Sequence, residues 1–361
     1  MTIFTNAGSN RKQCPQCHLV FIGDVQTCPC DGSVLAYTSL VSYDAEVVPG
    51  YRLEREVGSG GSAKVYKAVC LQTHEPVAVK ILHEWHVDDL DQVEHFNKEA
   101  ELTSRLSSRH TINVKDFGTL PDLRPYMVMD YIDGQPLSSF IENEPVSADW
   151  ALPIFVQIAW GLAHCHALGI VHCDIKPSNI LLSEQGDDRN VVKIVDFGIA
   201  KSVHDLNGTG SPEGETRGSP LYMSPEQCMG RVLDNRSDIY SLGCLMYEML
   251  TGRPVFFAAE AVAVMKKHVY ETPMPFFLSP NEGAAGLEKI VLKAISKKVG
   301  DRYQDISRLQ IDLQRCLASM RSQQAVERRR RMQVVQPLYA VPAVSAVQAV
   351  PPAEAVRPIV A

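Results

Sequence analysis

The sequence has no uninterrupted run of about 18 apolar residues, the length that a membrane-spanning helix requires. Its first residues, MTIFTNAGSNRKQ, also lack the apolar core of a signal peptide. These two absences argue against the membrane and secreted classes. We therefore predict a cytoplasmic protein with no membrane partner.

A basic excess is missing as well. The 35 Lys and Arg residues are outnumbered by 42 Asp and Glu residues, so the formal net charge is −7 and no attraction to nucleic acid is expected. One basic cluster, Glu327–Arg331, comes after the last helical pattern and is interpreted as a solvated helix end. Hydrophobic residues at 45% and charged residues at 21% indicate a globular chain over most of its length.

The chain changes character twice along its length. Residues 1–50 are rich in turns and cysteines. They are too few to bury a stable core without a bound metal or a disulfide. Residues 51–316 contain regular strand and helix patterns, and residues 317–361 hold a helix end followed by a tail of Ala, Val and Pro. Because proline interrupts helices, the tail from Val334 is expected to be disordered.

Strand patterns precede helical patterns in the middle segment. Apolar alternation predicts strands early in this segment, and spacings of three and four predict helices later. Examples are the strands Tyr51–Val57 and Val77–Ile81 and the helices Trp150–His166 and Ser237–Leu250. This order predicts an α+β fold in which a small β-rich lobe, about 51–130, comes before a larger helical lobe, about 134–316.

A glycine-rich stretch, GSGGSAKV, runs from Gly58 to Val65 between two strand patterns. Glycines let a backbone approach an anion closely, so the N–H groups of this loop could bind phosphates. Gly58 and Gly60 have the spacing of a phosphate-binding loop, but Ala63 stands where a third glycine is expected. On these residues alone, a nucleotide site and an ordinary glycine-rich hairpin are equally open.

Lys80 lies in a strand pattern with apolar neighbours, where a buried ammonium group requires an acid partner. The following helical pattern, Asp91–Leu106, places Glu99 on the same inward stripe as Phe96 and Thr103. We therefore expect Lys80 and Glu99 to form an ion pair. The alternative is two surface residues that do not meet.

The stretch IVHCDIKPSNILL combines groups that suit phosphoryl transfer. Asp174 can accept a proton from a substrate hydroxyl, Lys176 can neutralise the transferring phosphate, and Asn179 can bind a metal ion. Further along the chain, Asp196 follows a strand pattern and precedes a glycine turn. Its carboxylate is a second candidate ligand for Mg²⁺, which prefers oxygen ligands.

Together these segments resemble the motifs of one family. In order along the chain they are GSGGSAKV, VAVK, the helical Glu99, HCDIKPSN, DFG, SPLYMSPE, RSDIYSLG and DRY. From Tyr51 to Cys316 the sequence is similar to the bacterial, eukaryotic-like serine/threonine protein kinases. The resemblance implies the two-lobed protein kinase fold and the transfer of phosphate to Ser or Thr hydroxyls of proteins, including the chain itself, in bacterial signalling.

The resemblance also implies ATP and Mg²⁺ (or Mn²⁺) as cofactors and assigns roles to individual residues. The catalytic residues implied are Lys80, Glu99, Asp174 and Lys176, and the Mg²⁺ ligands are Asn179 and Asp196. The nucleotide-binding residues implied are Gly58, Gly60, Val65, Ala78, Lys80, Met129, Asp130, Ile132 and Leu181, with Met129 as gatekeeper.

Further residues are implied to have structural roles or to report the substrate class. Glu226 is expected to pair with Arg302, and Asp238 to brace the catalytic loop. Lys176 and Ser219 are similar to the residues of serine/threonine kinases and not of tyrosine kinases.

Two other functions stay open. A pseudokinase scaffold would bind nucleotide and partner proteins without transfer, although the presence of all the implied catalytic and metal-binding residues argues for an enzyme. A small-molecule kinase is disfavoured by Ser219–Glu226, which resembles a peptide-docking platform. A homodimer through the small lobes is also left open.

Cys173 stands where the family carries an arginine that contacts a phosphate on the activation segment. A thiol cannot make this contact. We therefore expect activity to depend little on phosphorylation of this segment, even though Ser202, Thr209, Ser211 and Thr216 offer acceptor sites. A redox role for Cys173 is less favoured than a tolerated substitution.

Four of the ten cysteines cluster near the N-terminus: Cys14, Cys17, Cys28 and Cys30. The cluster resembles a small zinc ribbon, in which bound Zn²⁺ supplies folding energy and the domain serves recruitment or positioning. Only one residue separates Cys28 from Cys30, so His18 or Asp31 could provide the fourth ligand. The alternatives are a disordered segment with free thiols and a redox pair.

Overall fold

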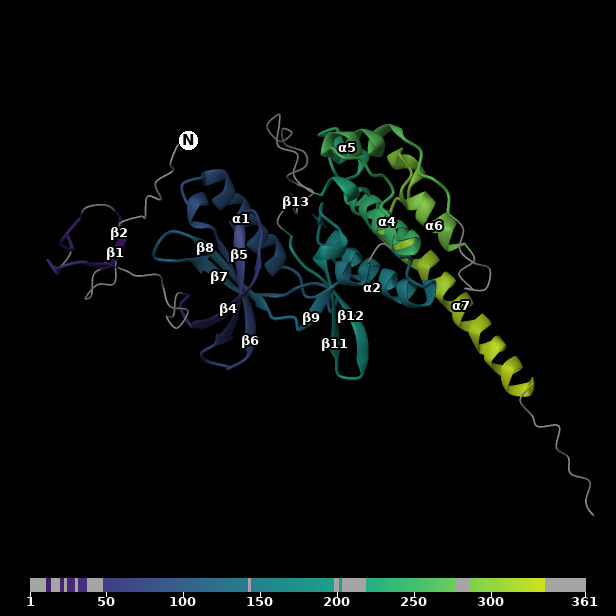
Figure 1. Cartoon of the computed structure of the whole chain (residues 1–361), viewed down its shortest axis with the longest axis horizontal. Helices are drawn as coiled ribbons and strands as arrows, with labels where there is room; N and C mark the ends of the chain where they lie inside the picture. The colour runs from purple at the N-terminus through teal and green to yellow at the C-terminus, as the bar shows by residue number, and fades with distance from the viewer. Residues whose placement is uncertain are drawn as a thin grey trace, which may run out of the picture.

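A computed structural model of the chain is shown in Figure 1. It describes residues 11–13, 20–22, 25–29, 32–37, 48–141, 144–197, 201–202, 219–276 and 286–334. Side chains are described for all of these except 11–13, 20–22, 36–37, 201–202 and 331–334.

The small lobe contains a five-stranded antiparallel sheet in the order β4-β5-β6-β8-β7. Its strands are β4 Tyr51–Ser59, β5 Ala63–Cys70, β6 Pro76–Leu82, β7 Val114–Thr119 and β8 Pro125–Asp130. Alternate residues of β6 face opposite sides of the sheet. Val79 and Ile81 belong to one buried cluster, whereas Ala78 and Leu82 belong to the large core that continues into the helical lobe.

Helix α1, Leu90–Ser104, covers one side of this lobe (Figure 1). The carboxylate of Asp89 caps the helix by accepting hydrogen bonds from the N–H groups of Asp91 and Gln92. The buried face includes Phe96, Glu99 and Thr103, so the predicted inward position of Glu99 is confirmed.

The large lobe is helical (Figure 1). Its helices are α2 Ala148–Ala167, α3 Pro225–Cys228, α4 Asn235–Thr251, α5 Ala261–Tyr270, α6 Leu287–Ala294 and α7 Ile306–Val334. One short 3-10 helix lies in the small lobe, at Glu84–His86. Others follow at Leu137–Phe140, Pro177–Asn179, Pro220–Tyr222 and Val299–Asp301. The predicted order of a β-rich lobe and then a helical lobe is confirmed.

A small sheet positions the residues between the two lobes. It has the order β12-β11-β9, with β9 Gly134–Pro136, β11 Ile180–Gln185 and β12 Asp188–Ile194. A separate two-stranded sheet joins β10, Ile170–Val171, to β13, Lys201–Ser202. The catalytic-loop stretch therefore lies between β10 and β11.

Helix α4 forms the centre of the large lobe, and most of its residues are buried. Gly243 of α4 packs against the end of α6. A Cβ atom at this position would be 2.6 Å from the Ile295 side chain and 2.9 Å from the Ala294 side chain. A glycine is therefore needed for the observed packing of the two helices.

Helix α7 confirms the interpretation of the basic cluster as a solvated helix end. The helix continues to Val334 and includes the cluster Glu327–Arg331. Met320 is buried, whereas residues 321–330 are exposed on all sides. Because Arg, Gln and Glu are good helix formers, the helix continues beyond the last buried residue without an apolar stripe. The tail after residue 334 lies outside the described residues.

The N-terminal segment contains a small sheet in the order β2-β1-β3. Its strands are β1 Arg11–Gln13, β2 Val20–Ile22 and β3 Ala36–Tyr37. Cys28 is buried and lies in a turn whose ends are paired, because its N–H donates to the carbonyl oxygen of Ser33 at 2.8 Å. The other predicted zinc ligands, Cys14, Cys17, Cys30 and the substitutes His18 and Asp31, lie outside the described residues.

In the part of the chain that the structure describes, no helix is both long and apolar enough to cross a membrane.

Candidate active site

Three charged side chains meet between the lobes. The Lys80 ammonium group donates to both carboxylate oxygens of Glu99, at 2.6 and 2.9 Å, and to Asp196 Oδ1 at 3.1 Å. Lys80 comes from β6, Glu99 from α1 and Asp196 from the segment after β12. The predicted Lys80–Glu99 ion pair is confirmed, and the network joins both lobes.

Electrostatics favours the charged forms of Lys80 and Asp196, whereas burial raises the pKa of Glu99. Burial by itself lowers the pKa of Lys80, but the carboxylates of Glu99 and Asp196 more than offset it, so the net shift of the pKa is upward. The charge of Lys80 lowers the pKa of Asp196 to about 2. The Asp196 side chain is 49% exposed. It therefore presents an ionised carboxylate on an open side of the network.

The candidate catalytic loop is held around Asp174, which is 9% exposed. Lys176 Nζ donates to Asp174 Oδ2 at 2.6 Å, and Asn179 Nδ2 donates to the same oxygen at 3.1 Å. Asn179 Nδ2 also donates to the Asp174 carbonyl oxygen at 2.9 Å. On the other side, the N–H of Ser219 donates to Asp174 Oδ1 at 3.2 Å. The structure thus brings together the three residues that the stretch HCDIKPSN was predicted to provide.

Asp238 holds this loop in place through hydrogen bonds to its backbone, as expected. Its carboxylate accepts hydrogen bonds from the N–H groups of His172, at 2.9 Å, and Cys173, at 2.8 Å, and it also contacts His166 Nε2 at 2.8 Å. Asp238 is fully buried, and although burial opposes its ionisation, His166 and the backbone donors lower its pKa overall. Cys173 has a positive φ of 67°, an uncommon conformation for a residue with a side chain. The two hydrogen bonds to Asp238 stabilise this backbone conformation.

Cys173 is buried in a small apolar cluster with Val171 and Leu233. Its carbonyl oxygen accepts a hydrogen bond from Gln227 Nε2 at 2.7 Å. Gln227 also completes a capping box with Ser224 at the start of α3. Sequence reasoning missed Gln227, although the spacing of Ser224 and Gln227 could have identified the cap. The link joins the catalytic loop to the end of the activation segment.

Glu226 and Arg302 form a buried, bidentate ion pair in the large lobe, as expected. The two guanidinium nitrogens donate to the two carboxylate oxygens at 2.7 and 2.8 Å. Burial opposes ionisation of Glu226, but the hydrogen bonds from Arg302 prevail and lower its pKa. The pair connects α3 to the segment before α7.

The glycine-rich loop joins β4 to β5. The N–H of Gly60 donates to the Ala63 carbonyl oxygen at 2.9 Å, which closes the hairpin. Gly58 lies opposite Val65 in the register of the two strands. No heavy atom lies within 4 Å of the position that a Cβ atom of Gly58 would take. The loop therefore has open space beside its backbone.

The residues implied to bind the nucleotide come from both lobes. Ala78 and Met129 face each other in the register of β6 and β8, and both belong to the large core with the half-buried Val65. Leu181 lies on β11 of the large lobe and is half-buried. The N–H of Asp130 donates to the Asn113 carbonyl oxygen at 3.0 Å. This N–H is therefore not available to the nucleotide. The carbonyl oxygen of Asp130 is left to make the contact expected at this residue.

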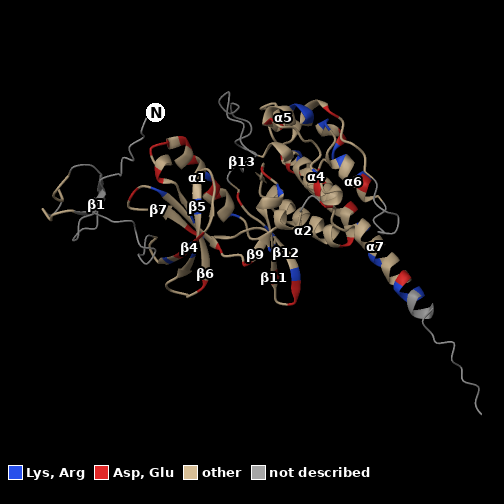
Figure 2. Ribbon diagram, viewed as in Figure 1, with Lys and Arg blue, Asp and Glu red and all other residues tan. Residues whose placement is uncertain are grey.

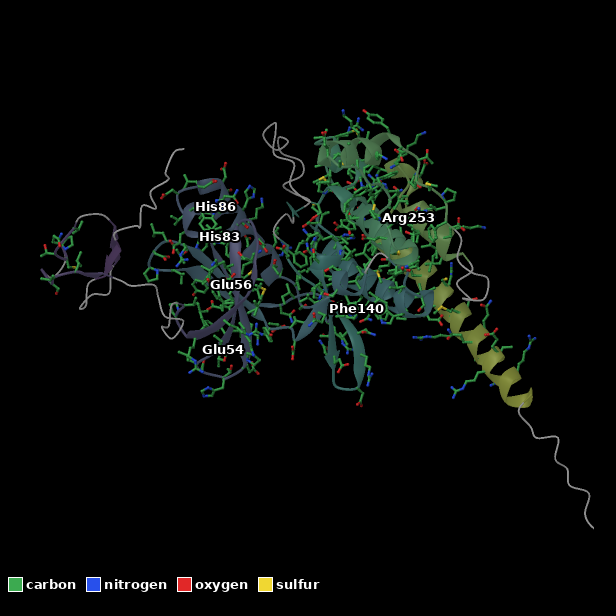
Figure 3. All side chains as sticks on the ribbon, in the orientation of Figure 1. Glu54, Glu56, His83, His86, Phe140 and Arg253 are labelled. Carbon is green, nitrogen blue, oxygen red and sulfur yellow. The ribbon has the colours of Figure 1, made fainter. Side chains whose placement is uncertain are left out.

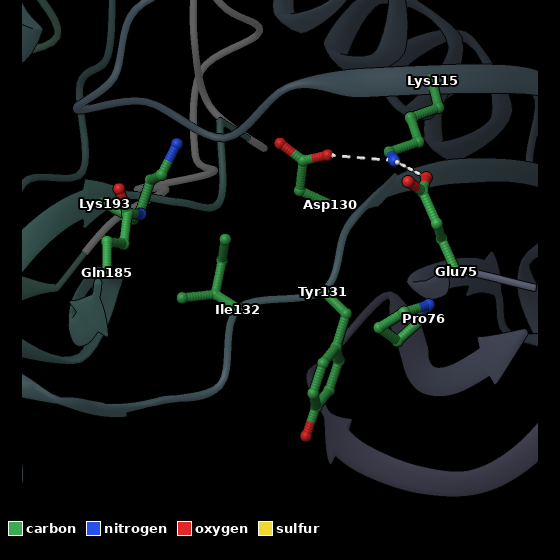
Figure 4. A pocket seen from close by; sticks show the side chains of 8 residues that line it. All are labelled: Glu75, Pro76, Lys115, Asp130, Tyr131, Ile132, Gln185 and Lys193. Atoms are coloured by element: carbon green, nitrogen blue, oxygen red, sulfur yellow. Dashed lines mark hydrogen bonds and ion pairs between the residues drawn. The ribbon is translucent and has the colours of Figure 1, made fainter.

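A polar cavity of about 340 Å³ lies beside Asp130 and Ile132 (Figure 4). Lys115 Nζ forms ion pairs with the two acidic residues of the cavity, with Glu75 at 3.3 Å and with Asp130 at 3.5 Å. The cavity is lined by Glu75, Pro76, Lys115, Asp130, Tyr131, Ile132, Gln185 and Lys193. Of the residues implied to bind the nucleotide, the cavity contains Asp130 and Ile132 and none of the others.

No group of three or more His, Cys, Asp or Glu side chains that could hold a metal ion occurs among the described residues. Most of the predicted zinc ligands fall outside that part of the chain, so zinc binding stays a prediction.

Comparison with known proteins identifies the family that this fold and site define. Residues 51–327 match the model of the protein kinase domain. The chain therefore belongs to the protein kinase family.

Three relatives from bacteria are named as serine/threonine-protein kinases. The chain is 36% identical over 267 residues to the serine/threonine-protein kinase PknB of Mycolicibacterium smegmatis, which covers 73% of this chain and 42% of that protein. It is 38% identical over 266 residues to the probable serine/threonine-protein kinase CPE1738 of Clostridium perfringens, covering 73% and 38% of the two chains. It is 34% identical over 270 residues to the serine/threonine-protein kinase pkn3 of Myxococcus xanthus, covering 73% and 49%. The chain thus spans less than half the length of these curated relatives.

Proposed function

We propose that the chain is an ATP- and Mg²⁺-dependent serine/threonine protein kinase that phosphorylates protein substrates, including itself. The observation that carries the proposal is the single network of Lys80, Glu99 and Asp196, which joins the two lobes. The relatives named as serine/threonine-protein kinases support the substrate class. A scaffold that only binds nucleotide would not require all of these charges together with Asp174.

The residues fit the expected cofactors. The ionised, half-exposed carboxylate of Asp196 offers hard oxygen atoms of the kind that Mg²⁺ prefers. The side-chain amide nitrogen of Asn179 donates to Asp174. The amide oxygen of Asn179 is therefore left as the second candidate ligand. When bound, ATP supplies the phosphoryl group and Mg²⁺ neutralises its charge.

The remaining work is done by side chains of this chain. Asp174 accepts the proton of the substrate hydroxyl, and the short contact with Lys176 places a positive charge where the transferred group arrives. Lys80, oriented by Glu99, binds the nucleotide phosphates. The buried hydrogen bonds from Asp238 keep the catalytic loop in place during the reaction.

The test uses purified chain incubated with labelled ATP and Mg²⁺, beside the variant Asp174→Asn. We expect label on Ser or Thr in the wild type and a loss of about 10²- to 10⁴-fold in the variant, the usual worth of a general base. Nucleotide binding should be unchanged in the variant. Demonstrable ATP binding without transfer to the chain or to a generic acceptor protein would instead favour the pseudokinase scaffold.

For the N-terminal segment we infer a zinc ribbon that recruits or positions a partner. The spacing of the four cysteines and the burial of Cys28 within a turn support it. The metal content of the purified chain tests this inference, with one zinc expected per chain and none in Cys14→Ser/Cys17→Ser. Zinc-free wild-type chain with the same thermal stability would contradict it. The cytoplasmic location and the small-lobe dimer remain predictions.

A further inference from the structure

Two histidines contact the tip of the glycine-rich loop. His83 Nε2 lies 2.9 Å from the carbonyl oxygen of Gly60, and His86 Nε2 lies 3.3 Å from the carbonyl oxygen of Gly61. Because a carbonyl oxygen only accepts hydrogen bonds, both imidazoles must donate. Both histidines belong to the connection between β6 and α1, in the small lobe (Figure 3). Neither was singled out by sequence reasoning, because no residue spacing predicts a contact between this connection and the loop.

His83 is held on both sides. Its side chain is 5% exposed, and its N–H donates to the Ser62 carbonyl oxygen at 2.9 Å. The indole of Trp85 stacks on the imidazole, with 4.1 Å between ring centroids and an interplanar angle of 15°. A donor fixed in this way loses little further freedom when it binds the loop. The half-buried His86 lies beside it, 6.5 Å away between ring centroids.

The contacts determine how the loop backbone is oriented. In a trans peptide, the C=O and the following N–H point in opposite directions. A hydrogen bond from His83 to the Gly60 carbonyl therefore turns the N–H of Gly61 away from the β6–α1 connection. The hydrogen bond from His86 to the Gly61 carbonyl does the same for the N–H of Ser62. Glycine peptides adopt many orientations, so a loop without these contacts would lose more entropy on binding a ligand.

We propose that His83 and His86 are positioning residues that hold the glycine-rich loop with its N–H groups directed toward the nucleotide phosphates. The inference rests on the proposed function, because it concerns the same nucleotide. It adds residues that lie outside the kinase motifs and act on the nucleotide only through the loop backbone.

The test compares the full-length variants His83→Phe and His86→Phe with His83→Gln, which keeps an N–H donor near the position of Nε2. The control is His74→Asn, at an exposed histidine in the turn at the other end of β5 and β6. One readout is amide hydrogen exchange of the loop in nucleotide-free protein, and the other is steady-state kinetics with ATP. We expect at least about threefold faster exchange of the Gly60 N–H in both Phe variants, and a KM for ATP that rises about three- to tenfold, as expected for the loss of one hydrogen bond. The kcat should stay within about twofold, and His83→Gln and His74→Asn should behave as wild type.

Unchanged exchange and unchanged KM in both Phe variants would overturn the inference. A lower kcat together with a lower thermal stability, at unchanged KM, would also overturn the inference, because this result would indicate a merely structural role. If His83→Phe fails to fold, the more exposed His86→Phe decides the question. Failure of the proposed function is distinguishable, since wild-type chain would then transfer no phosphate while the exchange rates would still report on the contacts.

Discussion

At the scale of single residues, the site depends on ion pairs and hydrogen bonds that hold buried charges. Lys80 is only 12% exposed and contacts two carboxylates, so its charge is retained in a place where an unpaired ammonium would be costly. Asp174 receives hydrogen bonds from side chains and from the Ser219 backbone. Substitution of one partner in such a network leaves the charge of the other partner buried and unpaired, which lowers the stability of the folded state.

Cys173 leads to a prediction about regulation. Its carbonyl is joined to Gln227, and Asp174 is joined to Ser219, so the end of the activation segment contacts the catalytic loop without a phosphate. We therefore expect phosphatase treatment to lower the initial rate less than about tenfold, equivalent to about 1.4 kcal/mol in activation free energy. The measurement is the initial rate of phosphate transfer to an acceptor protein, before and after treatment.

A matched variant separates the thiol from the backbone. Cys173→Ala keeps the carbonyl that Gln227 binds and should retain both the activity and its insensitivity to phosphatase. A larger drop in wild type than about tenfold would show that activity depends on the phosphate after all.

At the scale of elements, buried pairs connect segments that lie far apart in the sequence. The Glu226–Arg302 pair joins α3 to the segment before α7, and the Arg302 guanidinium also lies 4.7 Å from the ring centroid of Tyr240 on α4. Helix α7 is part of the same core as far as Met320 and is exposed beyond it. Packing of the helices therefore continues past the predicted domain end at Cys316.

Removal of Arg302 provides a test of this connection. Arg302→Met leaves the Glu226 carboxylate buried without its guanidinium partner, and we expect the free energy of unfolding to fall by about 3–5 kcal/mol. The double variant Arg302→Met/Glu226→Gln should recover part of this loss, because no unpaired charge remains. Urea denaturation monitored by tryptophan fluorescence measures both. A loss below about 1 kcal/mol in the single variant would mean that the pair contributes no more than an exposed one.

At the scale of the whole molecule, the lobes share one core cluster and both carry interspersed charges of both signs (Figure 2). The pH dependence of global stability is then determined mainly by buried groups. His268 is completely buried, and burial lowers its pKa to about 3.

This shift predicts how stability varies with pH. The unfolded chain protonates His268 near its ordinary pKa of 6.5, whereas the folded chain does so only near 3. The unfolded state therefore binds more protons between these values, and stability is complete above pH 6.5 and decreases as the pH falls. We expect the free energy of unfolding to fall by up to about 1.4 kcal/mol per pH unit below 6.5. The lowered pKa values of Asp196, Glu226 and Asp238 add a further loss below about pH 4.5.

Urea denaturation at pH 7.5, 6.5, 5.5 and 5.0 measures this slope. His268→Gln should have a flatter profile between pH 6.5 and 5, since its side chain does not titrate, whatever its stability at pH 7.5. The same slope in variant and wild type would show that His268 is not its source.

Much of the site could be predicted from local sequence. Lys80 and Glu99 were paired correctly because strand and helix periodicity place both on inward faces, and the HCDIKPSN stretch brings its side chains together over only six residues, from Asp174 to Asn179. The solvated helix end at Glu327–Arg331 was also predicted, although the exposed turns after Met320 have no apolar stripe and follow helix propensity alone.

The α+β order, several strands and helices of the two lobes and the identity of the charged residues could be predicted from the sequence, since periodicity and short-range spacing are local properties. Which distant groups meet depends on the packing of the folded chain. The hydrogen bonds of His83 and His86 to the loop, of Gln227 to Cys173 and of Asp130 to Asn113 depend on how separate elements pack. Such contacts leave no periodic pattern, because each joins a side chain or N–H group to a backbone carbonyl, and every residue has one.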